Sequence, residues 1–526
     1  SCTFQPLKNE TSFFMEYGWG ASNDFPKFTQ NILTKDAYGK FLSVCRKEDV
    51  WIVQEGSSVI EYDIDVSHKD TFGGHYDSFV ESTHAFLNPK QIFIYPKDSI
   101  GDINVDFMLP TDWVSFVIWD RVNRTFVPKG IHELVDCFIA LGDYEEHHIN
   151  VEGVEIRFAI RPSDHHFKVA SILEFLKGIA KQQAAIFGGL PGRLCIICNR
   201  RKDSGNAGSV SGRTMVLELN EAASDEDFKV STGVAWTLAH EFFHFWNTGI
   251  GKGFYWISEG FTDYYTYLTL VKLGLMTQFS FLTELQKRYL TSTAIDVTRR
   301  LSLSATKEKS IFDDQDISDL CYKKGSVVAA ILDSEIRLMT RDRKSLDDFM
   351  RSLYKFGQKA IAYSDKDFIS LLSETTGDDM SPLYNELVNN CDPATLKERF
   401  PSIMSTLGPQ PLLKAENLPE SLWWRITEGR RRDSCVLLAG VYLDSANYVS
   451  WLSAGSVDVP FKLEETHTRA FSIIQDECTG QALLGLIGES KTTTQLSEEN
   501  RINPAEMKAK LKELKKRSGS GPERHL

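Results

Sequence analysis

The segment Thr237–Asn247 constrains the fold of this chain because it is largely apolar and yet contains His240, Glu241 and His244. Residues four apart lie on one face of an α-helix, so the two imidazoles can point at the same place. Buried polar groups cost free energy unless they have partners, and a divalent cation supplies one. The pattern therefore predicts a buried helix whose histidines share a metal ion. The alternative is a chance H-E-x-x-H on a surface helix.

A third ligand is expected shortly after this helix. Catalytic zinc commonly has three protein ligands and an open position for water. Glu259 follows a glycine-containing stretch in which the chain can turn back, so it can face His240 and His244. The alternative is a surface glutamate near a helix N-terminus. The sequence thus predicts one Zn²⁺ held by these three residues.

Two carboxylates can serve this metal site without being ligands. Glu241 is rotated by about 100° from His240 around the helix, so it can take a proton from an attacking water. Asp263 lies one helical turn after Glu259 and can accept the free N–H of a ligand histidine. A solvated helix carboxylate is the other interpretation of Asp263.

The hydrophobic periodicity changes along the chain. Period-2 alternation at 60–66, 103–107 and 154–160 predicts strands of a β-sandwich-like domain. A helical pattern follows at 166–187, then strands at 194–198 and 214–219 with a polar, glycine-rich loop at 200–212 between them. Helical patterns dominate 232–387, and 434–488 is strand-like again. A capped helix beginning at Pro504 is expected near the end of the chain.

These patterns predict an α+β multidomain protein. Residues 1–162 form the N-terminal β domain, residues 163–400 form the catalytic domain with a small mixed sheet and a helical body, and residues 401–526 form a linker, a small C-terminal β-rich module and a terminal helix. At 526 residues, about three domains are expected.

The composition restricts the class of partner. A formal charge of −13 argues against a nucleic-acid binder, which normally has a basic face. No stretch is long and apolar enough for a transmembrane helix. Nine dispersed cysteines do not suggest a disulfide framework, and Cys195 and Cys198 lie in a strand-like apolar segment typical of a core. The sequence leaves the oligomeric state open. It also leaves the compartment open, cytoplasmic or periplasmic and secreted, because a leader before Ser1 can have been removed.

The motifs resemble a known family. H-E-x-x-H followed by E-G is the gluzincin pattern of thermolysin-like proteases and zinc aminopeptidases. The segments around His240–Asn247 and Trp256–Tyr265 resemble those of the glycyl aminopeptidase family of gluzincin zinc metallopeptidases. Further similarities lie at 109–113, 133–136, 322–325, 332–337 and 345–348. The resemblance implies a thermolysin-like catalytic domain and a role for Tyr322 as hydrogen-bond donor to the developing oxyanion.

Two departures from the family pattern concern substrate access. His244 and Glu259 are separated by a shorter segment than is usual in the family. The segment Gly208–Thr214, which corresponds to a strand with a substrate-binding glutamate, lacks that acid. Arg213 in this segment can instead bind a carboxylate or carbonyl, or can simply face solvent.

Three functions are compatible with these residues. The first is a zinc aminopeptidase that favours small N-terminal residues such as glycine and alanine, as the resemblance implies. The second is an endopeptidase or oligopeptidase with the same zinc chemistry. The third is a catalytically silent scaffold that binds peptides. In the first two, Glu241 is the general base and a peptide is the substrate.

Overall fold

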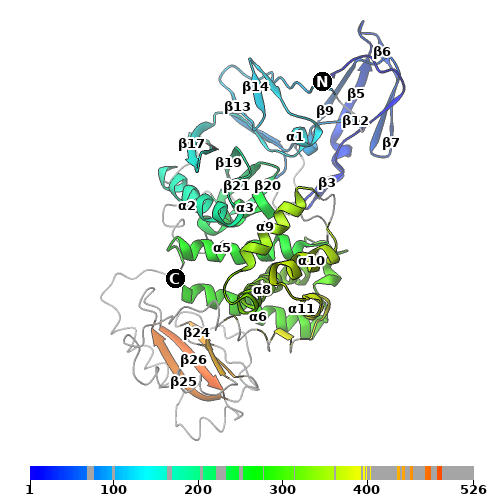
Figure 1. The fold of residues 1–526 in the computed structure, drawn as a ribbon. Coiled ribbons are helices and arrows are strands. Elements are labelled where there is room, and N and C mark those ends of the chain that lie inside the picture. The colour runs from blue at the N-terminus through cyan, green and yellow to red at the C-terminus, as the bar shows by residue number, and fades with distance from the viewer. Residues whose placement is uncertain are drawn as a thin grey trace. The chain divides into compact units, whose positions relative to one another are not determined.

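The computed structural model describes residues 1–67, 76–96, 101–162, 169–201, 205–220, 233–247, 253–276, 278–312, 314–359 and 363–392, together with short segments up to 403 and five strands between 435 and 488. The chain divides into two compact units, Ser1–Gly249 and Ile250–Leu526. Figure 1 labels many of their helices and strands. Among the described helices, none has both the length and the apolar character needed to cross a membrane.

The first unit begins with two antiparallel four-stranded sheets that share one core. Their strand orders are β1-β9-β5-β6 and β12-β2-β8-β7. Phe13 and Trp51 from one sheet and Ile60 from the other are at most 1% exposed and belong to one apolar cluster. Facing sheets with a common core confirm the predicted sandwich-like domain. The strands are β1 (Cys2–Thr3), β2 (Thr11–Phe14), β5 (Thr29–Lys35), β6 (Phe41–Leu42), β7 (Val44–Lys47), β8 (Val50–Val53), β9 (Val59–Ile64) and β12 (Tyr95–Pro96).

A third antiparallel sheet, β10-β11-β16-β13, continues this β-rich region. The strand predicted at 103–107 is wrong, because the structure has there a single bridge between Val105 and Phe126. The alternation is still used for packing, since Ile103, Val105 and Phe107 contact the core cluster of this sheet. The elements are β3 (Gly18–Trp19), β4 (Ser22–Asn23), β10 (Phe79–Val80), β11 (His84–Leu87), β13 (Val114–Phe116), β14 (Asp120–Val122), β15 (Thr125–Val127), β16 (Ile139–Gly142) and the short helix α1 (Ile131–Val135).

A five-stranded mixed sheet completes the first unit. Its order is β17-β18-β19-β21-β20, with β18-β19 and β19-β21 parallel and the outer pairs antiparallel. The predicted strands and helix are confirmed as β18 (Val154–Ile160), β19 (Leu194–Arg201), β21 (Thr214–Asn220) and α2 (Val169–Phe187). The loop predicted at 200–212 is partly wrong, because β20 (Ala207–Ser211) forms an edge strand there. The remaining elements are β17 (Glu145–Val151) and α3 (Val234–Asn247).

The described part of the second unit is mainly helical, as the periodicity predicts. Helix α5 (Gly260–Lys272) contacts both α6 (Gln278–Arg299) and α8 (Gly325–Thr340). A π-helical turn, η6 (Leu320–Lys324), joins the start of α8 and packs on α6. The other helices are α4 (Tyr255–Ser258), α7 (Gln315–Asp319), α9 (Leu346–Gly357), α10 (Asp365–Thr376) and α11 (Ser381–Tyr384).

Five strands of the C-terminal segment are described, in agreement with its strand-like sequence. A two-stranded sheet pairs β22 (Cys435–Leu438) with β23 (Val441–Asp444). A three-stranded sheet has the order β24 (Trp451–Ser453), β26 (Ala482–Gly488) and β25 (Thr468–Gln475). The helix predicted from Pro504 lies outside the described residues. The α+β class, with a β-rich N-terminal region and a helical body, is confirmed.

Candidate metal centre

Helix α3 brings the two predicted histidine ligands together. His240 and His244 are 4% and 7% exposed, and their Nε2 atoms lie 3.2 Å apart. Most other side chains of the helix are apolar, and Trp236 stacks on the His240 ring with 4.9 Å between the ring centroids. From α2, the Gln183 amide donates a 2.7 Å hydrogen bond to the carbonyl of Ala239. The helix is therefore fixed by packing from several sides, and its two imidazoles converge.

The edge strand β20 lies directly beside Glu241. A Cβ on Gly208 would lie 2.4 Å from Glu241 Cγ, closer than two non-bonded carbon atoms can approach. Glycine in the interior of a strand commonly marks such a close approach. Glu241 itself is half-buried. The strand that the sequence interpretation missed therefore forms one wall around the expected general base.

The position of β20 is fixed by the segment Glu133–Asp136. Lys90 Nζ binds Asp136 at 2.5 Å and Ser211 Oγ of β20 at 3.0 Å. At the end of the same hairpin, Arg213 binds Glu133 at 2.6 Å. Arg213 is thus engaged by a protein carboxylate, a partner that the sequence did not indicate. These contacts attach the edge strand to the N-terminal β-rich region.

Glu259 occupies the joint between two helices. It follows α4, precedes α5 and is half-buried, and the Ser258 hydroxyl donates a 3.2 Å hydrogen bond to its Oε1. Immediately after it, Gly260 approaches Gly325 so closely that a Cβ on Gly260 would lie 2.5 Å from the Gly325 backbone. The second unit therefore places Glu259 beside a backbone-to-backbone crossing with the start of α8.

The ligand atoms of His240, His244 and Glu259 all lie within 4.8 Å of one another. Among the residues that the structure describes, these side chains form the group able to hold a metal ion. Two nitrogens that each bind a tetrahedral zinc at about 2.0–2.1 Å are about 3.3 Å apart, close to the 3.2 Å between the imidazoles. Two imidazoles and one carboxylate are also a typical catalytic zinc set. The residues present fit one zinc ion.

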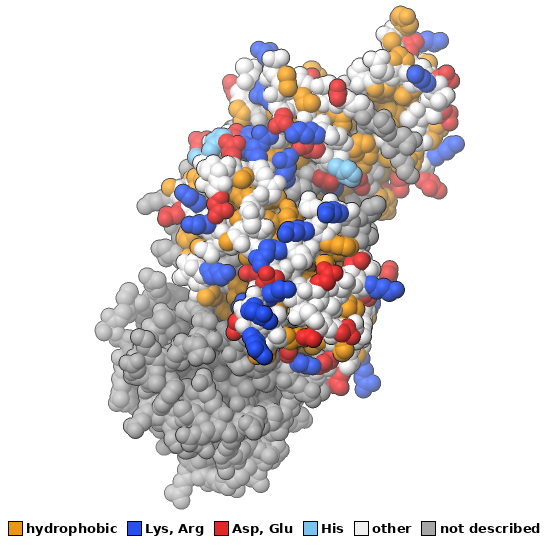
Figure 2. Space-filling view, in the orientation of Figure 1, with side chains coloured by type: hydrophobic (Ala, Val, Ile, Leu, Met, Phe, Trp, Pro, Cys, Tyr) orange, Lys and Arg blue, Asp and Glu red, His pale blue; other side chains and the backbone are white. Residues whose placement is uncertain are grey.

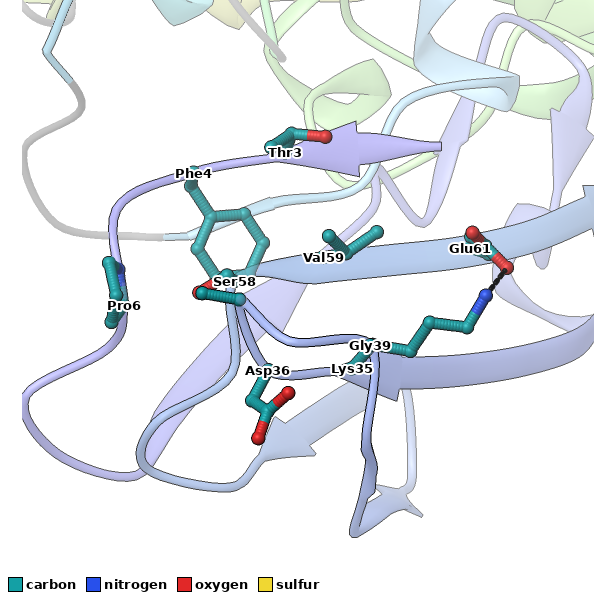
Figure 3. A pocket seen from close by; sticks show the side chains of 10 residues that line it. Thr3, Phe4, Pro6, Lys35, Asp36, Gly39, Ser58, Val59 and Glu61 are labelled. Atoms are coloured by element: carbon teal, nitrogen blue, oxygen red, sulfur yellow. Dashed lines mark hydrogen bonds and ion pairs between the residues drawn. The ribbon is translucent and has the colours of Figure 1, made fainter.

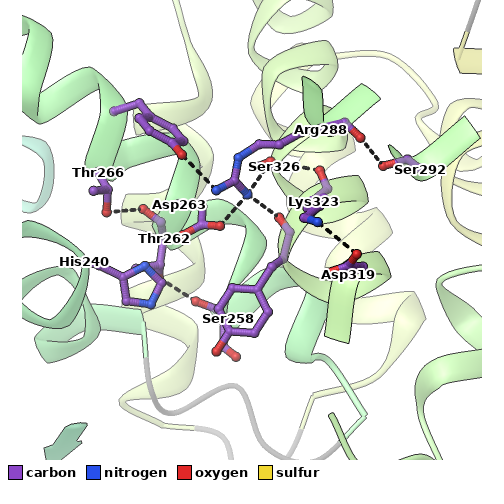
Figure 4. A network of polar contacts seen from close by, with 12 residues as sticks. His240, Ser258, Thr262, Asp263, Thr266, Arg288, Ser292, Asp319, Lys323 and Ser326 are labelled. Atoms are coloured by element: carbon purple, nitrogen blue, oxygen red, sulfur yellow. Dashed lines mark hydrogen bonds and ion pairs between the residues drawn. The ribbon is translucent and has the colours of Figure 1, made fainter. Parts of the chain in front are cut away.

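Asp263 and Tyr322 both lie in the second unit. Asp263 follows Glu259 by four residues, and Tyr322 belongs to a turn that packs on the helices on either side of Glu259. Asp263 is 1% exposed, and its carboxylate binds Arg288 (Figure 4). Tyr322 is a half-buried residue of the π-helical turn η6, which contacts α4 and α5. A π-helical turn inside an α-helical run is frequent at functional sites. The predicted roles of Asp263 toward a histidine and of Tyr322 toward an oxyanion stay predictions.

Part of this chain matches a known family model, and the chain is similar to several solved structures. Residues 21–143 match the family model of the Peptidase M61 N-terminal domain. The chain is similar to the solved aminopeptidase N family protein from Idiomarina loihiensis, at 17% identity over 74% of this chain and 73% of that chain, with a TM-score of 0.63. It is also similar to a mutant of the M1 zinc metallopeptidase from Deinococcus radiodurans, at 13% identity over 73% and 87% of the two chains, with a TM-score of 0.47. A search of curated proteins finds no sequence match.

The family match and the donor set lead to the same class of enzyme. The protein from Idiomarina loihiensis shares the fold of this chain over most of both lengths, and the peptidase match covers much of the N-terminal β-rich region. With the converging His-His-Glu group, these findings support a zinc metallopeptidase. They do not single out one peptidase family.

Two other features are separate from the metal centre. Cys195 and Cys198 are at most 1% exposed, which agrees with the core interpretation, and burial raises the pKa of the Cys195 thiol to about 12.

A hollow on the N-terminal sheet is lined by residues of β1, β5 and β9 (Figure 3). There Lys35 and Glu61 bind each other at 2.8 Å. On the face shown in Figure 2, basic and acidic side chains are intermixed.

The sequence interpretation missed Gly208 and Arg288. Gly208 carried a detectable signal, because a glycine between two strand-like segments can mark a close approach. Arg288 had no local signal: it lies in the middle of α6, far in sequence from every expected site residue, and only the fold brings it to Asp263.

Proposed function

We propose that this chain is a zinc metallopeptidase that hydrolyses peptide bonds and acts as an aminopeptidase on small N-terminal residues. The observation that carries the proposal is the convergence of His240, His244 and Glu259 within 4.8 Å, with the Glu241 carboxylate on the same helix as the two histidines. The preference for glycine or alanine is supported by the resemblance of the flanking motifs to glycyl aminopeptidases.

The side chains have distinct tasks in this reaction. When bound, zinc would act as a Lewis acid that makes water more acidic and polarises the substrate carbonyl. Glu241 accepts the proton of the attacking water and passes it to the leaving amine. Tyr322 donates a hydrogen bond to the carbonyl oxygen as negative charge develops there, a contribution typically of about 2.7–4 kcal/mol.

Strand β20 favours a second candidate, an endopeptidase or oligopeptidase with the same chemistry. Its sequence, Ala207 to Ser211, has no carboxylate at the edge beside Glu241 that could bind a substrate ammonium group. An extended peptide that continues past the scissile bond in both directions does not require such a group.

Matched peptides distinguish the two candidates. One peptide series begins with free glycine, alanine or leucine, and a second has the same sequences with an acetylated N-terminus; products are identified by mass spectrometry. An aminopeptidase removes the first residue of the free series, fastest for glycine or alanine, and leaves the acetylated series intact. Internal cleavage of both series supports the endopeptidase. Hydrolysis that persists in a chelator and in Glu241→Gln contradicts both.

A further inference from the structure

Arg288 connects the helix that follows Glu259 to the turn that carries Tyr322. Its Nη1 atom donates to Asp263 Oδ2 at 2.5 Å and to the carbonyl oxygen of Tyr322 at 3.2 Å. Its Nη2 atom donates to the Tyr267 hydroxyl at 2.9 Å. The guanidinium side chain is 12% exposed and Asp263 is 1% exposed. Figure 4 shows Arg288 directed at Asp263 and Ser326.

Both principal partners belong to the proposed reaction site. Asp263 lies one helical turn after Glu259, and its backbone N–H donates a 2.9 Å hydrogen bond to the Glu259 carbonyl. The second partner is the peptide group of Tyr322 itself. A planar guanidinium can bind two acceptors in a fixed geometry, which the single ammonium of lysine cannot reproduce. Arg288 therefore fixes the spacing between the backbones of Glu259 and Tyr322.

A second ion pair holds the same turn from the same helix. Lys324 Nζ binds both carboxylate oxygens of Asp296 at 2.8 and 2.9 Å, and both side chains are at most 2% exposed. Asp296 lies about two helical turns after Arg288 on α6. Helix α6 thus binds η6 at two points, through Arg288 and through Asp296. Of these two residues, Arg288 also binds α5, the helix that follows Glu259.

The ion pair with Asp263 explains why an arginine can be buried here, but it does not explain the contact of Arg288 with the Tyr322 carbonyl oxygen. A buried cation needs a charged partner, and Asp263 supplies it. Burial alone would lower the pKa of Arg288, but the Asp263 carboxylate and the Tyr267 hydroxyl together more than offset this, so the pKa lies above its ordinary value. The additional bond to the Tyr322 carbonyl serves no charge balance. It restrains the π-helical turn.

We propose that Arg288 is a positioning residue that sets the Tyr322 hydroxyl relative to Glu259 through the Tyr322 backbone. This inference rests on the proposed function, because it assigns Tyr322 a task in catalysis. Misplacing a reacting group by about 1 Å can cost about 100-fold in rate. We therefore expect Arg288→Lys, at saturating zinc, to lower kcat by about 10- to 100-fold with KM within about threefold.

The test is a double-mutant cycle in the full chain. Wild type, Arg288→Lys, Tyr322→Phe and the double variant are assayed on the peptide that wild type cleaves best, with zinc content measured for each. If Arg288 acts through the Tyr322 hydroxyl, adding Arg288→Lys to Tyr322→Phe lowers kcat by less than about threefold. The same loss in both backgrounds, or a kcat of Arg288→Lys equal to that of wild type, overturns the proposal.

Two controls separate this inference from stability and from the proposed function. Arg337→Lys changes an arginine on α8 that also binds a buried aspartate, Asp333, at 3.2 Å, although its side chain is more exposed than that of Arg288. The kcat of this variant should stay within about twofold of wild type. Should Arg288→Lys fail to fold, Arg288→Gln takes its place at a temperature where its circular dichroism matches wild type. A wild-type chain without zinc-dependent hydrolysis rejects the proposed function; an active wild type with an unaffected Arg288→Lys rejects this inference alone.

Discussion

Two regions supply the candidate site, and they are built in different ways. In α3, His240, Glu241 and His244 lie within one and a half turns of a single helix whose surroundings are apolar. In the second unit, Glu259 and Tyr322 belong to separate segments that are held together by a glycine crossing and by buried ion pairs. The first arrangement depends on local helical geometry, and the second depends on contacts between residues distant in sequence.

The difference shows where each region is vulnerable. A substitution on α3 that keeps the helix changes one chemical group and leaves its neighbours in place. A substitution at the crossing of Gly260 and Gly325 moves backbone, so it changes the spacing of every group attached to those helices. We therefore expect different effects from a substitution that removes one reacting group and from a substitution that moves the backbone.

The largest effect is expected from Glu241→Gln in the first region. The amide cannot accept the proton of water, so kcat should fall by about 100- to 10,000-fold. Zinc content should be unchanged, because Glu241 is not among the grouped ligands. Steady-state kinetics and metal analysis check both statements, with the exposed Glu308→Gln as the matched control. Undiminished hydrolysis in Glu241→Gln removes it as general base.

Tyr322→Phe is the corresponding chemical change in the second region. Loss of one donor to a developing oxyanion typically lowers kcat by about 100- to 1,000-fold. KM should change little, because the bond strengthens in the transition state. Initial rates over a range of peptide concentrations measure the two constants, and the change Tyr354→Phe on α9 is the control. A rise in KM at constant kcat would place Tyr322 in substrate binding instead.

Gly325→Ala tests the geometric side of the second region. Its Cβ would lie 2.3 Å from the Trp256 carbonyl oxygen, so the two backbones must separate. We expect a loss of about 1–3 kcal/mol in the free energy of unfolding. Chemical denaturation measures it, and Gly101→Ala, where a Cβ meets nothing within 4 Å, is the control. Equal stability of the two variants would mean that the crossing is not tightly packed.

Gly208→Ala applies the same geometric change to the first region and should have the smallest effect. The new methyl group would displace the Glu241 side chain, which can rotate, and would lie 3.0 Å from the Val216 carbonyl oxygen, which needs only a small shift. We therefore expect kcat to fall by about tenfold and folding stability to change by less than about 1 kcal/mol. Gly205→Ala, which has open space around it, is the control for both measurements. Identical kinetics of the two variants would show that β20 does not constrain Glu241.

The same contrast explains what could be predicted from the sequence. The helical spacing of His240 and His244 and the alternation in β18 depend on neighbours in sequence, and the structure has the predicted helix and the predicted strand there. The polar, glycine-rich composition of 200–212 predicts a loop, whereas pairing with β21 makes Ala207–Ser211 a strand. At 103–107 the alternation is real, but it serves packing against the core and forms a single bridge.

Long-range partners carried no signal in the sequence. The sequence shows that Asp263 lies one helical turn after Glu259. The ion pair between Asp263 and Arg288, in contrast, depends on the packing of α5 against α6. The attachment of Lys324 to Asp296 likewise joins residues on two elements. Helix and strand patterns reveal which face is buried, but not which charged group on another element meets it.

The most direct test of the central claim is the zinc stoichiometry of the purified full chain and of its ligand variants. After removal of metal and reconstitution with zinc, we expect about one zinc per wild-type chain. In His244→Ala and Glu259→Ala, the zinc affinity should fall by more than the roughly 10- to 100-fold typical for loss of an outer partner, while Glu308→Ala should match wild type. A wild-type chain without stoichiometric zinc, or ligand variants with undiminished affinity, would contradict the account.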